Sequence, residues 1–405
     1  MSLLLHPTPV HFLFFNSHKT LAFPNVILLL ILAVFLCLAA PVKAFDESES
    51  SAVILQYHHV STETPAITSI SPELFEQHLA YIKEQQFNVI SLLDLITMLR
   101  DKTPIPNKSV VITFDDAYRS VYEEAWPRLK RYNYPFTVFV NTGFVTGQSA
   151  NASFNLALPE GGHKYALTWS QLKEMADQGV TLANHTVTHL HMIRSLQNET
   201  STQWLARLTR EIDHAETTLV KQVAQGHKAL AYPFGEYTQS IQSLLASKGY
   251  VALAQQSGAV THDSDLQALP RFAFGGVYTD LSGFKTKVNA LSLPVSESKA
   301  YVDGHQVADS ILSHNSGIPE VQLSVHLSEN QARRITCYAS GQGRVEAQYQ
   351  FKDSGVGVLT VSLEQQVPVG RSRINCTLAS KWSGRYYWYS HQLIRKAKDD
   401  LWYKE

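Results

Sequence analysis

The stretch that decides the fold reads VVITFDD over residues 110–116, an apolar run that ends in two aspartates. Its β-branched and aromatic residues predict a buried strand from Ser109 to Phe114, which leaves the aspartates at the carboxyl end of the strand. Three other polar motifs also fall just past an apolar run: Tyr-His at 57–58, Asn-His at 184–185 and Pro-Phe-Gly at 233–235. Because reactive groups of (β/α) barrels collect at the carboxyl ends of the strands, we expect these motifs to share one rim.

Strand-like and helix-like segments alternate from residue 51 to about residue 293. Amphipathic helical patterns separate the expected strands, which cover residues 52–57, 109–114, 136–140, 180–183, 229–232 and 250–254. This alternation implies a parallel sheet, either a barrel or a doubly wound sheet, and the shared rim position of the polar motifs favours the barrel. A loop between Gly147 and Tyr165 is a candidate substrate-facing insertion.

The pattern changes after about Leu293. Helical periodicity is lost, and short segments of alternating apolar and polar residues predict an all-β, sandwich-like module. Two of the three cysteines, Cys337 and Cys376, fall in these segments and are expected to form a disulfide if the chain is exported. The aromatic run at 386–389 is either a sugar-stacking surface or, since alternate strand residues point inward, part of a packing or partner-docking surface.

The N-terminal segment has a different character. Residues 25–40 read NVILLLILAVFLCLAA without a charge and are followed by Pro-Val-Lys-Ala. Such a run, closed by small residues, predicts a secretory signal, and the alternative is an uncleaved membrane anchor that would associate the protein with a membrane. We therefore expect an exported protein (periplasmic, secreted or membrane-anchored) divided into a signal or anchor at 1–44, a barrel domain at 45–293 and a β module at 294–405.

Composition gives no support to a nucleic-acid-binding function. The 405 residues carry a formal net charge of −1, so there is no basic bias to attract a phosphate backbone. The hydrophobic fraction of 44% is ordinary for a globular protein and allows a packed core.

The histidines His185 and His189 suggest a metal site. They are four positions apart, so that they would face one way on a helical turn. A carboxylate from elsewhere in the chain would complete a three-ligand site with room for water, the arrangement expected of a hydrolytic metal centre. The aspartate not used as a ligand would then be free to act as a base.

Three motifs in this order are similar to those of the polysaccharide deacetylases, the NodB-homology or carbohydrate esterase family 4 proteins: TFDD at 113–116, HTVTH at 185–189 and YPFG at 232–235. The resemblance covers roughly residues 53–274 and implies a distorted (β/α)7 barrel. It further implies the site roles, with Asp116, His185 and His189 as metal ligands, Asp115 as the general base, and Phe234 with Tyr232 at the oxyanion and substrate position. The implied cofactor is one divalent ion, with zinc expected and cobalt or nickel also compatible with mixed nitrogen and oxygen ligands.

The sequence departs from the family pattern at two positions. A late Leu-x-His motif, the usual source of the catalytic acid, has no counterpart before the β module, where Ser-Val-His at 324–326 lies too far along the chain. His58, in the Tyr-His-His-Val run at 57–60, is our candidate acid in preference to His59. This early motif resembles the branch that acts on poly-β-1,6-N-acetylglucosamine. Ala231 stands where the family's third motif has an arginine, and we hypothesise that Arg271 supplies that guanidinium.

The function that these observations predict is metal-dependent hydrolysis of acetamide groups on an N-acetylglucosamine-containing polysaccharide of the cell envelope or matrix. The expected partner is therefore an N-acetylated polysaccharide, not a nucleic acid. One alternative is a deacetylase of peptidoglycan, chitin oligomers or O-acetyl xylan. A second alternative, motivated by the two departures, is a non-catalytic carbohydrate-binding scaffold with a decayed barrel.

Overall fold

The computed structural model describes residues 50–146, 165–351 and 357–404. The predicted leader at 1–44 and nearly all of the predicted insertion between Gly147 and Tyr165 lie outside the described residues. Within the described ranges, no helix combines the length and apolarity that a membrane crossing needs.

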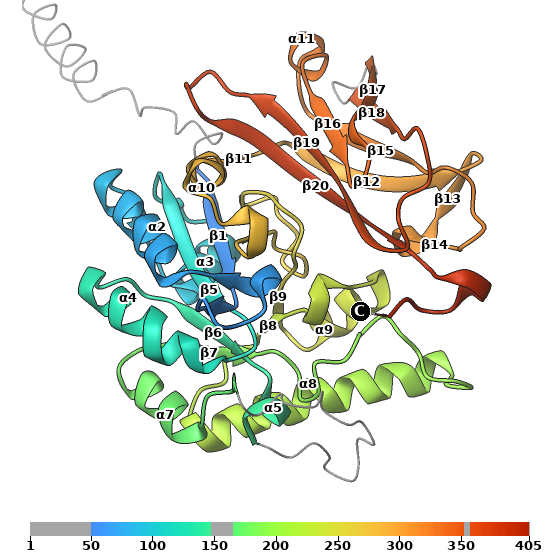
Figure 1. The fold of residues 1–405 in the computed structure, drawn as a ribbon. Helices are drawn as coiled ribbons and strands as arrows, with labels where there is room; N and C mark the ends of the chain where they lie inside the picture. The colour runs from blue at the N-terminus through green and yellow to red at the C-terminus, as the bar shows by residue number, and fades with distance from the viewer. Residues whose placement is uncertain (1–49, 147–164, 352–356, 405) are drawn as a thin grey trace, which may run out of the picture. The chain divides into compact units, whose positions relative to one another are not determined.

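The first sheet has eight strands, which all pair in parallel, and it curls with helices packed around it (Figure 1). Its order is β10-β1-β5-β6-β7-β8-β9, with β4 beside β5. The strands are β1 Ala52–Tyr57, β4 Asn88–Val89, β5 Ser109–Phe114, β6 Thr137–Val140, β7 Thr181–Asn184, β8 Ala229–Ala231, β9 Val251–Leu253 and β10 Phe272–Ala273. Since β9 and β10 are the two edges, the sheet forms a curled half-barrel, which confirms the predicted distorted (β/α) barrel.

The helices begin where the sequence places capping residues. Ser71 Oγ accepts a hydrogen bond from Leu74 N at the start of α2, and Thr168 forms a capping box at the start of α7. The helices are α2 Pro72–Glu84, α3 Leu92–Asp101, α4 Trp126–Tyr132, α5 Thr142–Thr146, α7 Trp169–Asp177, α8 Ser201–Val223, α9 Gln239–Ser247 and α10 Leu281–Val288. A π-helical turn at Val121–Ala125 leads directly into α4.

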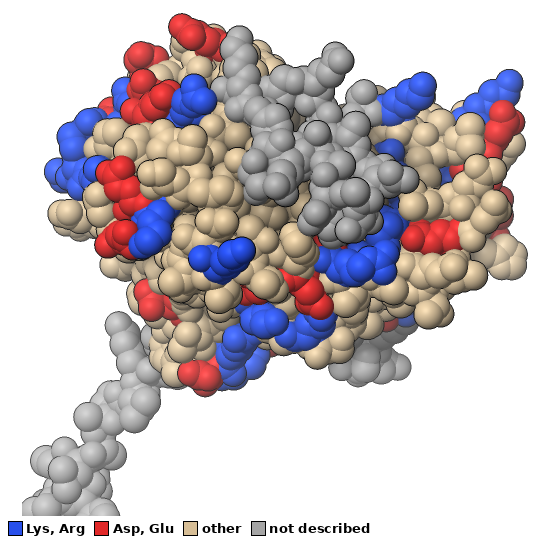
Figure 2. All heavy atoms as spheres, turned by 90° about the horizontal axis from the view of Figure 1, so that it is seen from below, with Lys and Arg blue, Asp and Glu red and all other residues tan. Residues whose placement is uncertain are grey.

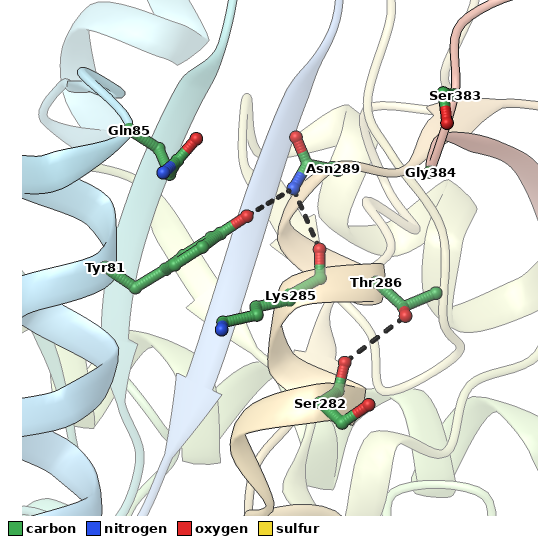
Figure 3. Close-up of a pocket in the computed structure, with 8 residues that line it drawn as sticks. All are labelled: Tyr81, Gln85, Ser282, Lys285, Thr286, Asn289, Ser383 and Gly384. Atoms are coloured by element: carbon green, nitrogen blue, oxygen red, sulfur yellow. Dashed lines mark hydrogen bonds between the residues drawn. The ribbon is translucent and has the colours of Figure 1, made fainter.

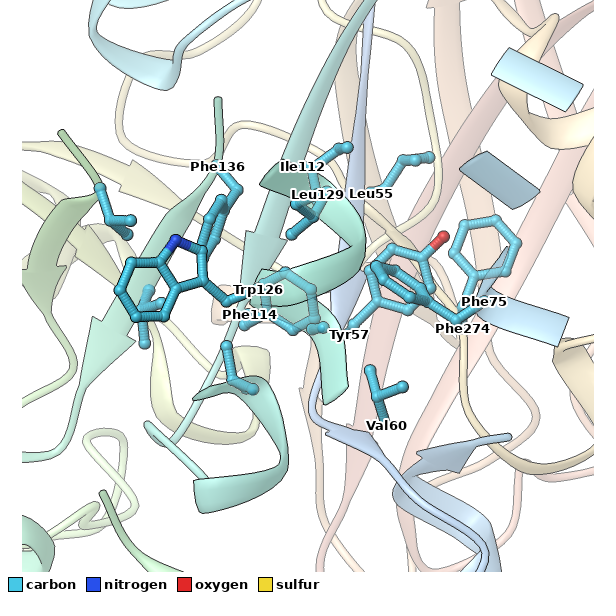
Figure 4. Packing of buried hydrophobic residues seen from close by; sticks show 14 of the residues in the cluster. Leu55, Tyr57, Val60, Phe75, Ile112, Phe114, Trp126, Leu129, Phe136 and Phe274 are labelled. Carbon is cyan, nitrogen blue, oxygen red and sulfur yellow. The ribbon is translucent and has the colours of Figure 1, made fainter. Parts of the chain in front are cut away.

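An aromatic cluster supports the ends of three adjacent strands (Figure 4). Tyr57 stacks on Phe274 with ring centroids 5.4 Å apart, and it meets the edge of Phe75 at 5.2 Å. Phe114, opposite Tyr57 in the register, lies 5.6 Å from it. Burial of each such side chain contributes roughly 1.5–3 kcal/mol. Because Tyr57 and Phe114 immediately precede His58 and Asp115, this cluster fixes where the rim residues begin.

The second sheet has ten strands that surround a separate apolar core. It is mostly antiparallel, and β17 joins its two layers: Val345 pairs with β16, whereas Glu346 onward pairs with β18. The strands are β11 Leu291–Ser292, β12 Val295–Val302, β13 His305–Val307, β14 Ile311–Leu312, β15 Glu320–Val325, β16 Thr336–Ala339, β17 Gly343–Phe351, β18 Gly357–Ser362, β19 Gly370–Ala379 and β20 Tyr386–Arg395. The predicted all-β module is therefore confirmed.

Two details of this module answer questions that the sequence raised. Cys337 and Cys376 stand opposite each other in β16 and β19 and form the predicted disulfide, with 4.1 Å between their Cα atoms. In the aromatic run, Tyr387 and Tyr389 pack on the core of the module, and Trp388 meets the edge of Phe272 at 5.2 Å. Three of the four rings are thus in packing contacts, and Tyr386 is the most exposed of the four, at 39%.

Candidate metal centre and active site

Asp116, His185 and His189 meet at the carboxyl edge of the first sheet. The Nε2 atoms of His185 and His189 each lie 3.3 Å from Asp116 Oδ1. Ligand atoms about 2.0–2.1 Å from a shared tetrahedral ion would be about 3.3–3.4 Å apart, so these spacings fit a bound divalent ion. Among the described residues, this is the only group of three or more His, Cys, Asp or Glu side chains close enough to hold a metal ion.

The two histidines lie in a loop, so the predicted helical turn is wrong. β7 ends at Asn184, and Thr186 and His189 then take left-handed backbone angles, with φ of 65° and 52°. A buried carboxylate explains why: Glu211 Oε2 accepts the N–H groups of Val187 and Thr188, each at 3.0 Å. Those N–H groups are bound to a side chain instead of to helical carbonyls, so the spacing of four brings the imidazoles together through a tight loop.

Glu211 is a supporting residue that the sequence analysis missed. It lies on the buried stripe of α8, is fully buried, and also accepts a hydrogen bond from the Thr188 hydroxyl at 2.9 Å. Burial raises the pKa of Glu211. The available signal was a carboxylate next to Ile212 on a mostly apolar stripe, which also carries the buried Glu216. An acid is rarely placed at such a position without a partner.

The hydrogen bonds of the ligand side chains favour metal binding. His185 Nδ1 donates to the carbonyl oxygen of Ala231 at 2.8 Å, which directs its Nε2 atom toward Asp116. Burial alone would raise the pKa of Asp116, but the neighbouring histidines hold it well below its usual value. Burial lowers the pKa of His189 to about 4. The cluster therefore offers an ionised carboxylate and a neutral imidazole, which are the ligand states that a divalent ion requires.

Asp115 forms a fully buried ion pair with Arg271. Nη1 and Nη2 of Arg271 donate to the two carboxylate oxygens at 2.7 and 2.8 Å, and Gln56 Nε2 donates to Oδ2 at 2.6 Å. Burial would raise the pKa of Asp115, but the charge of Arg271 holds it below the usual value. A carboxylate has about four acceptor positions, and these three bonds leave one on Oδ1. Asp115 is thus ionised, oriented and still able to accept a proton.

The structure brings Arg271 to the place that the sequence hypothesis required. Its Nε donates to the Ala254 carbonyl at 2.9 Å, which fixes the plane of the guanidinium. Gln56, the single polar residue in the β1 run AVILQY, is a further contact that the sequence analysis missed. The isolated amide of Gln56 in a buried strand was the sequence signal that could have identified this contact.

His58 and His59 differ in their surroundings. His59 is buried, and its ring stacks on Tyr118 at a centroid distance of 3.6 Å. Burial and the charge of His58 lower the pKa of His59 to about 4. His58 is partly exposed, and its charge acts on both aspartates and lowers their pKa values. Of the two, His58 is the imidazole that is both accessible and coupled to the site.

The third motif splits into a packing residue and a site residue. Tyr232 is fully buried, and its hydroxyl donates to the Gln267 carbonyl at 2.7 Å, so its side chain belongs to the core and not to the predicted substrate position. The backbone of Phe234 is left-handed, with φ 59° and ψ 0°, and its ring centroid lies 4.5 Å from that of His189 in an edge-on arrangement. Among the described residues, no acceptor is hydrogen-bonded to the Phe234 N–H.

Other surface features do not compete with this site. A hollow of about 370 Å³ lies between α2, α10 and the loop before β20, but its lining includes no carboxylate or imidazole (Figure 3). On the face shown in Figure 2, acidic and basic side chains of the described residues are interspersed without a broad basic patch.

The chain is similar to several known proteins. The family model described as polysaccharide deacetylase matches residues 102–253. YxkH of Bacillus subtilis is 28% identical over 229 residues, covering 56% of this chain and 72% of that protein. A poly-β-1,6-N-acetyl-D-glucosamine N-deacetylase of Staphylococcus aureus is 26% identical over 250 residues, covering 57% and 81%. A solved de-N-acetylase of Aggregatibacter actinomycetemcomitans shares the fold, with 22% identity, a TM-score of 0.50 and coverage of 58% and 98%.

Taken with the half-barrel and the residues at its rim, these similarities define a hydrolase of the polysaccharide N-deacetylase class. Residues 102–253 match the polysaccharide deacetylase family, and the domain that contains them is similar to the curated N-deacetylases of that family.

We expect the wild-type chain to bind about one zinc ion and His185→Ala to bind it at least ~100-fold more weakly, because one of three ligands is lost. Isothermal titration calorimetry and metal content after dialysis measure this. His326→Ala, which removes an exposed histidine of the β module, is the matched control and should keep the wild-type affinity. Wild-type zinc content in His185→Ala would contradict the site.

We expect Arg271→Ala to lower the free energy of unfolding by about 3–5 kcal/mol, because Asp115 is left as a buried charge without its partner. Adding Asp115→Asn should recover part of the loss, since the two side chains are coupled. Urea unfolding of the wild type, the two single variants and the double variant measures the coupling. Arg344→Ala, at an exposed arginine of β17, should change stability by less than about 0.5 kcal/mol. A similarly small effect of Arg271→Ala would show that the pair is not structurally important.

Proposed function

We propose that this protein hydrolyses the acetamide groups of N-acetylglucosamine residues in an envelope or matrix polysaccharide, giving acetate and a free amine. The observation that carries the proposal is the position of a buried, ionised Asp115 directly beside the Asp116–His185–His189 cluster. A base next to a three-ligand metal site is the arrangement that amide hydrolysis at neutral pH needs. Because the base and all three metal ligands are present, the site argues against a decayed, non-catalytic barrel.

Asp115 is the general base in this proposal. A divalent ion, with zinc expected and cobalt or nickel compatible, supplies Lewis-acid chemistry at Asp116, His185 and His189 when it is bound. The free acceptor position on Asp115 Oδ1 takes the proton from the attacking water. Arg271 and Gln56 hold the carboxylate in place, so that little reorganisation accompanies the proton transfer.

The Phe234 N–H is the proposed donor to the oxygen that becomes negative as the carbonyl is attacked. Its left-handed backbone angle sets the direction of this N–H, and the nearby His189 ring places it beside the metal cluster. A single preorganised donor of this kind contributes about 10²–10³ in rate.

His58 is the proposed acid for the leaving amine. It is partly exposed at the end of β1, where a sugar nitrogen could reach it, whereas the buried, stacked His59 has a pKa of about 4 and would be neutral at pH 7. Protonation of the nitrogen is required because an unprotonated amide anion is a very poor leaving group.

The β-1,6-linked polymer is the substrate that we favour. The early Tyr-His motif supports this choice, as does the Staphylococcus aureus relative, which is named for that polymer. Export is part of the proposal because the disulfide of Cys337 and Cys376 forms in oxidising compartments and the apolar segment at 25–40 resembles a signal.

Acetate release tests activity and substrate together. We expect the zinc-loaded chain to release acetate from β-1,6-linked N-acetylglucosamine oligomers faster than from β-1,4-linked oligomers of equal length, measured by mass spectrometry of the products. Chelator should abolish release and added zinc should restore it, because the water and carbonyl are no longer activated without the ion. Asp115→Asn is the matched inactive variant, and its loss of turnover should be at least ~10²-fold. Acetate release that chelator does not change would refute the proposal. Faster turnover of the β-1,4-linked oligomers would overturn the proposed β-1,6 preference.

The assignment of the acid is tested by comparing neighbouring histidines. His58→Ala should lower kcat for the acetamide by about 10²–10⁴-fold, yet affect an activated aryl acetate far less, because that leaving group needs no proton. Steady-state kinetics on both substrates measure the difference. His59→Ala is the control at the adjacent position. Equal losses on the amide and the ester in His58→Ala would remove His58 from this role.

A further inference from the structure

The loop at Pro233–Gly235 holds its central residue in an unfavourable conformation. Phe234 has φ 59° and ψ 0°, a left-handed region that bulky residues rarely adopt. Such a conformation persists only where neighbouring groups over-determine it. The question is therefore which contacts hold Phe234 there.

One set of contacts comes from the deacetylase domain. The His191 ring stacks on the Phe234 ring with centroids 3.7 Å apart and an interplanar angle of 6°. His191 Nδ1 is 2.8 Å from Glu236 Oε2, and Glu236 is fully buried. These contacts fix the ring but leave the backbone carbonyl of Phe234 to another partner.

That partner comes from the β module. Arg371 Nη1, on β19, donates to the Phe234 carbonyl oxygen at 2.6 Å, and its guanidinium carbon lies 5.3 Å from the centre of the Phe234 ring. Tyr403, near the C-terminus, donates to Glu236 Oε1 and thereby supports the residue that holds His191. The module thus contacts the loop directly through Arg371 and indirectly through Tyr403.

The strand that carries Arg371 is itself anchored. Arg371 is paired with Ile394 of β20, and Ile394 is buried in the same apolar cluster as Tyr232 and Ile241 of the deacetylase domain. Arg371 therefore extends from a backbone that is fixed against the third motif, which is the condition for a side chain to position another group.

We propose that Arg371 is a positioning residue for the deacetylase reaction, through which the β module sets the direction of the Phe234 N–H. Arg371 is neither one of the three metal ligands nor the proposed base or acid. It holds the carbonyl of Phe234, and with that carbonyl and the ring both fixed, the left-handed angle and the direction of the N–H follow. The inference rests on the proposed role of Phe234 and makes the β module a required part of the active site.

The test compares Arg371→Ala and Arg371→Lys with Arg344→Ala in the full-length, zinc-loaded protein. Arg344→Ala removes the same charge from an exposed position on β17 of the module. We expect Arg371→Ala to lower kcat by about 10-fold or more, less than the ~10²–10³ of a deleted oxyanion donor, because the N–H is misdirected but still present. KM and zinc content should be unchanged. Arg371→Lys should recover part of kcat, since an ammonium can also donate to the carbonyl.

A second readout does not depend on turnover. Hydrogen–deuterium exchange should be faster over residues 232–236 in Arg371→Ala, partly restored in Arg371→Lys and unchanged in Arg344→Ala. If wild type releases acetate and Arg371→Ala keeps kcat within about two-fold, the inference is wrong. If wild type releases no acetate, the proposed function fails by itself, and unaltered exchange in Arg371→Ala would then separately overturn the positioning of the loop.

Discussion

Two adjacent carboxylates at the end of one buried strand are the constraint on which the site depends. Asp115 is fully buried, and the Asp116 side chain is only 14% exposed, so both negative charges are largely removed from water. An uncompensated buried charge would be very unfavourable, and two such neighbours would repel each other as well. The two carboxylates are compensated differently. Asp115 pairs with a protein cation, Arg271, whereas Asp116 faces two imidazoles at distances that suit a metal ion, which would supply the positive charge.

This division separates the roles of the two aspartates. The counter-charge of Asp115 is part of the chain and stays whether or not an ion is bound, so the base keeps its orientation and its ionised state. The counter-charge of Asp116 would be a bound metal ion, which can exchange, as the role of a metal ligand requires. The curled parallel sheet makes both possible because β10 pairs with β1 and brings Arg271 next to β5, while β7 delivers His185 from the other side.

Much of this site could be predicted from the sequence, because residues just past apolar strands must gather at one edge of a parallel sheet. The rim positions of Asp116 and His185 were predicted in this way, whereas Arg271 was hypothesised because Ala231 replaces the arginine of the family motif. The residues that hold these side chains in place were not predicted. Gln56 and Glu211 are polar residues within mostly apolar patterns, and the periodicity of such a pattern indicates only that a position is buried. The helical geometry expected for the histidines failed for the same reason, since the Glu211 carboxylate that shapes their loop comes from a distant helix. The Arg371 contact joins residues 137 positions apart, across two domains with different patterns.

Backbone strain links these missed contacts to the chemistry. Asp116, Thr186, His189 and Phe234 all have positive φ, and all lie at the rim where the reacting groups meet. Each such residue costs about 1–3 kcal/mol. Polar groups hold two of them: Glu211 and Asn184 bind the N–H groups of the histidine loop, and Arg371 binds the Phe234 carbonyl. Several groups that hold the strained loops therefore lie outside the three family motifs, so a chain could keep every motif residue and still lose the geometry if these outer contacts were changed.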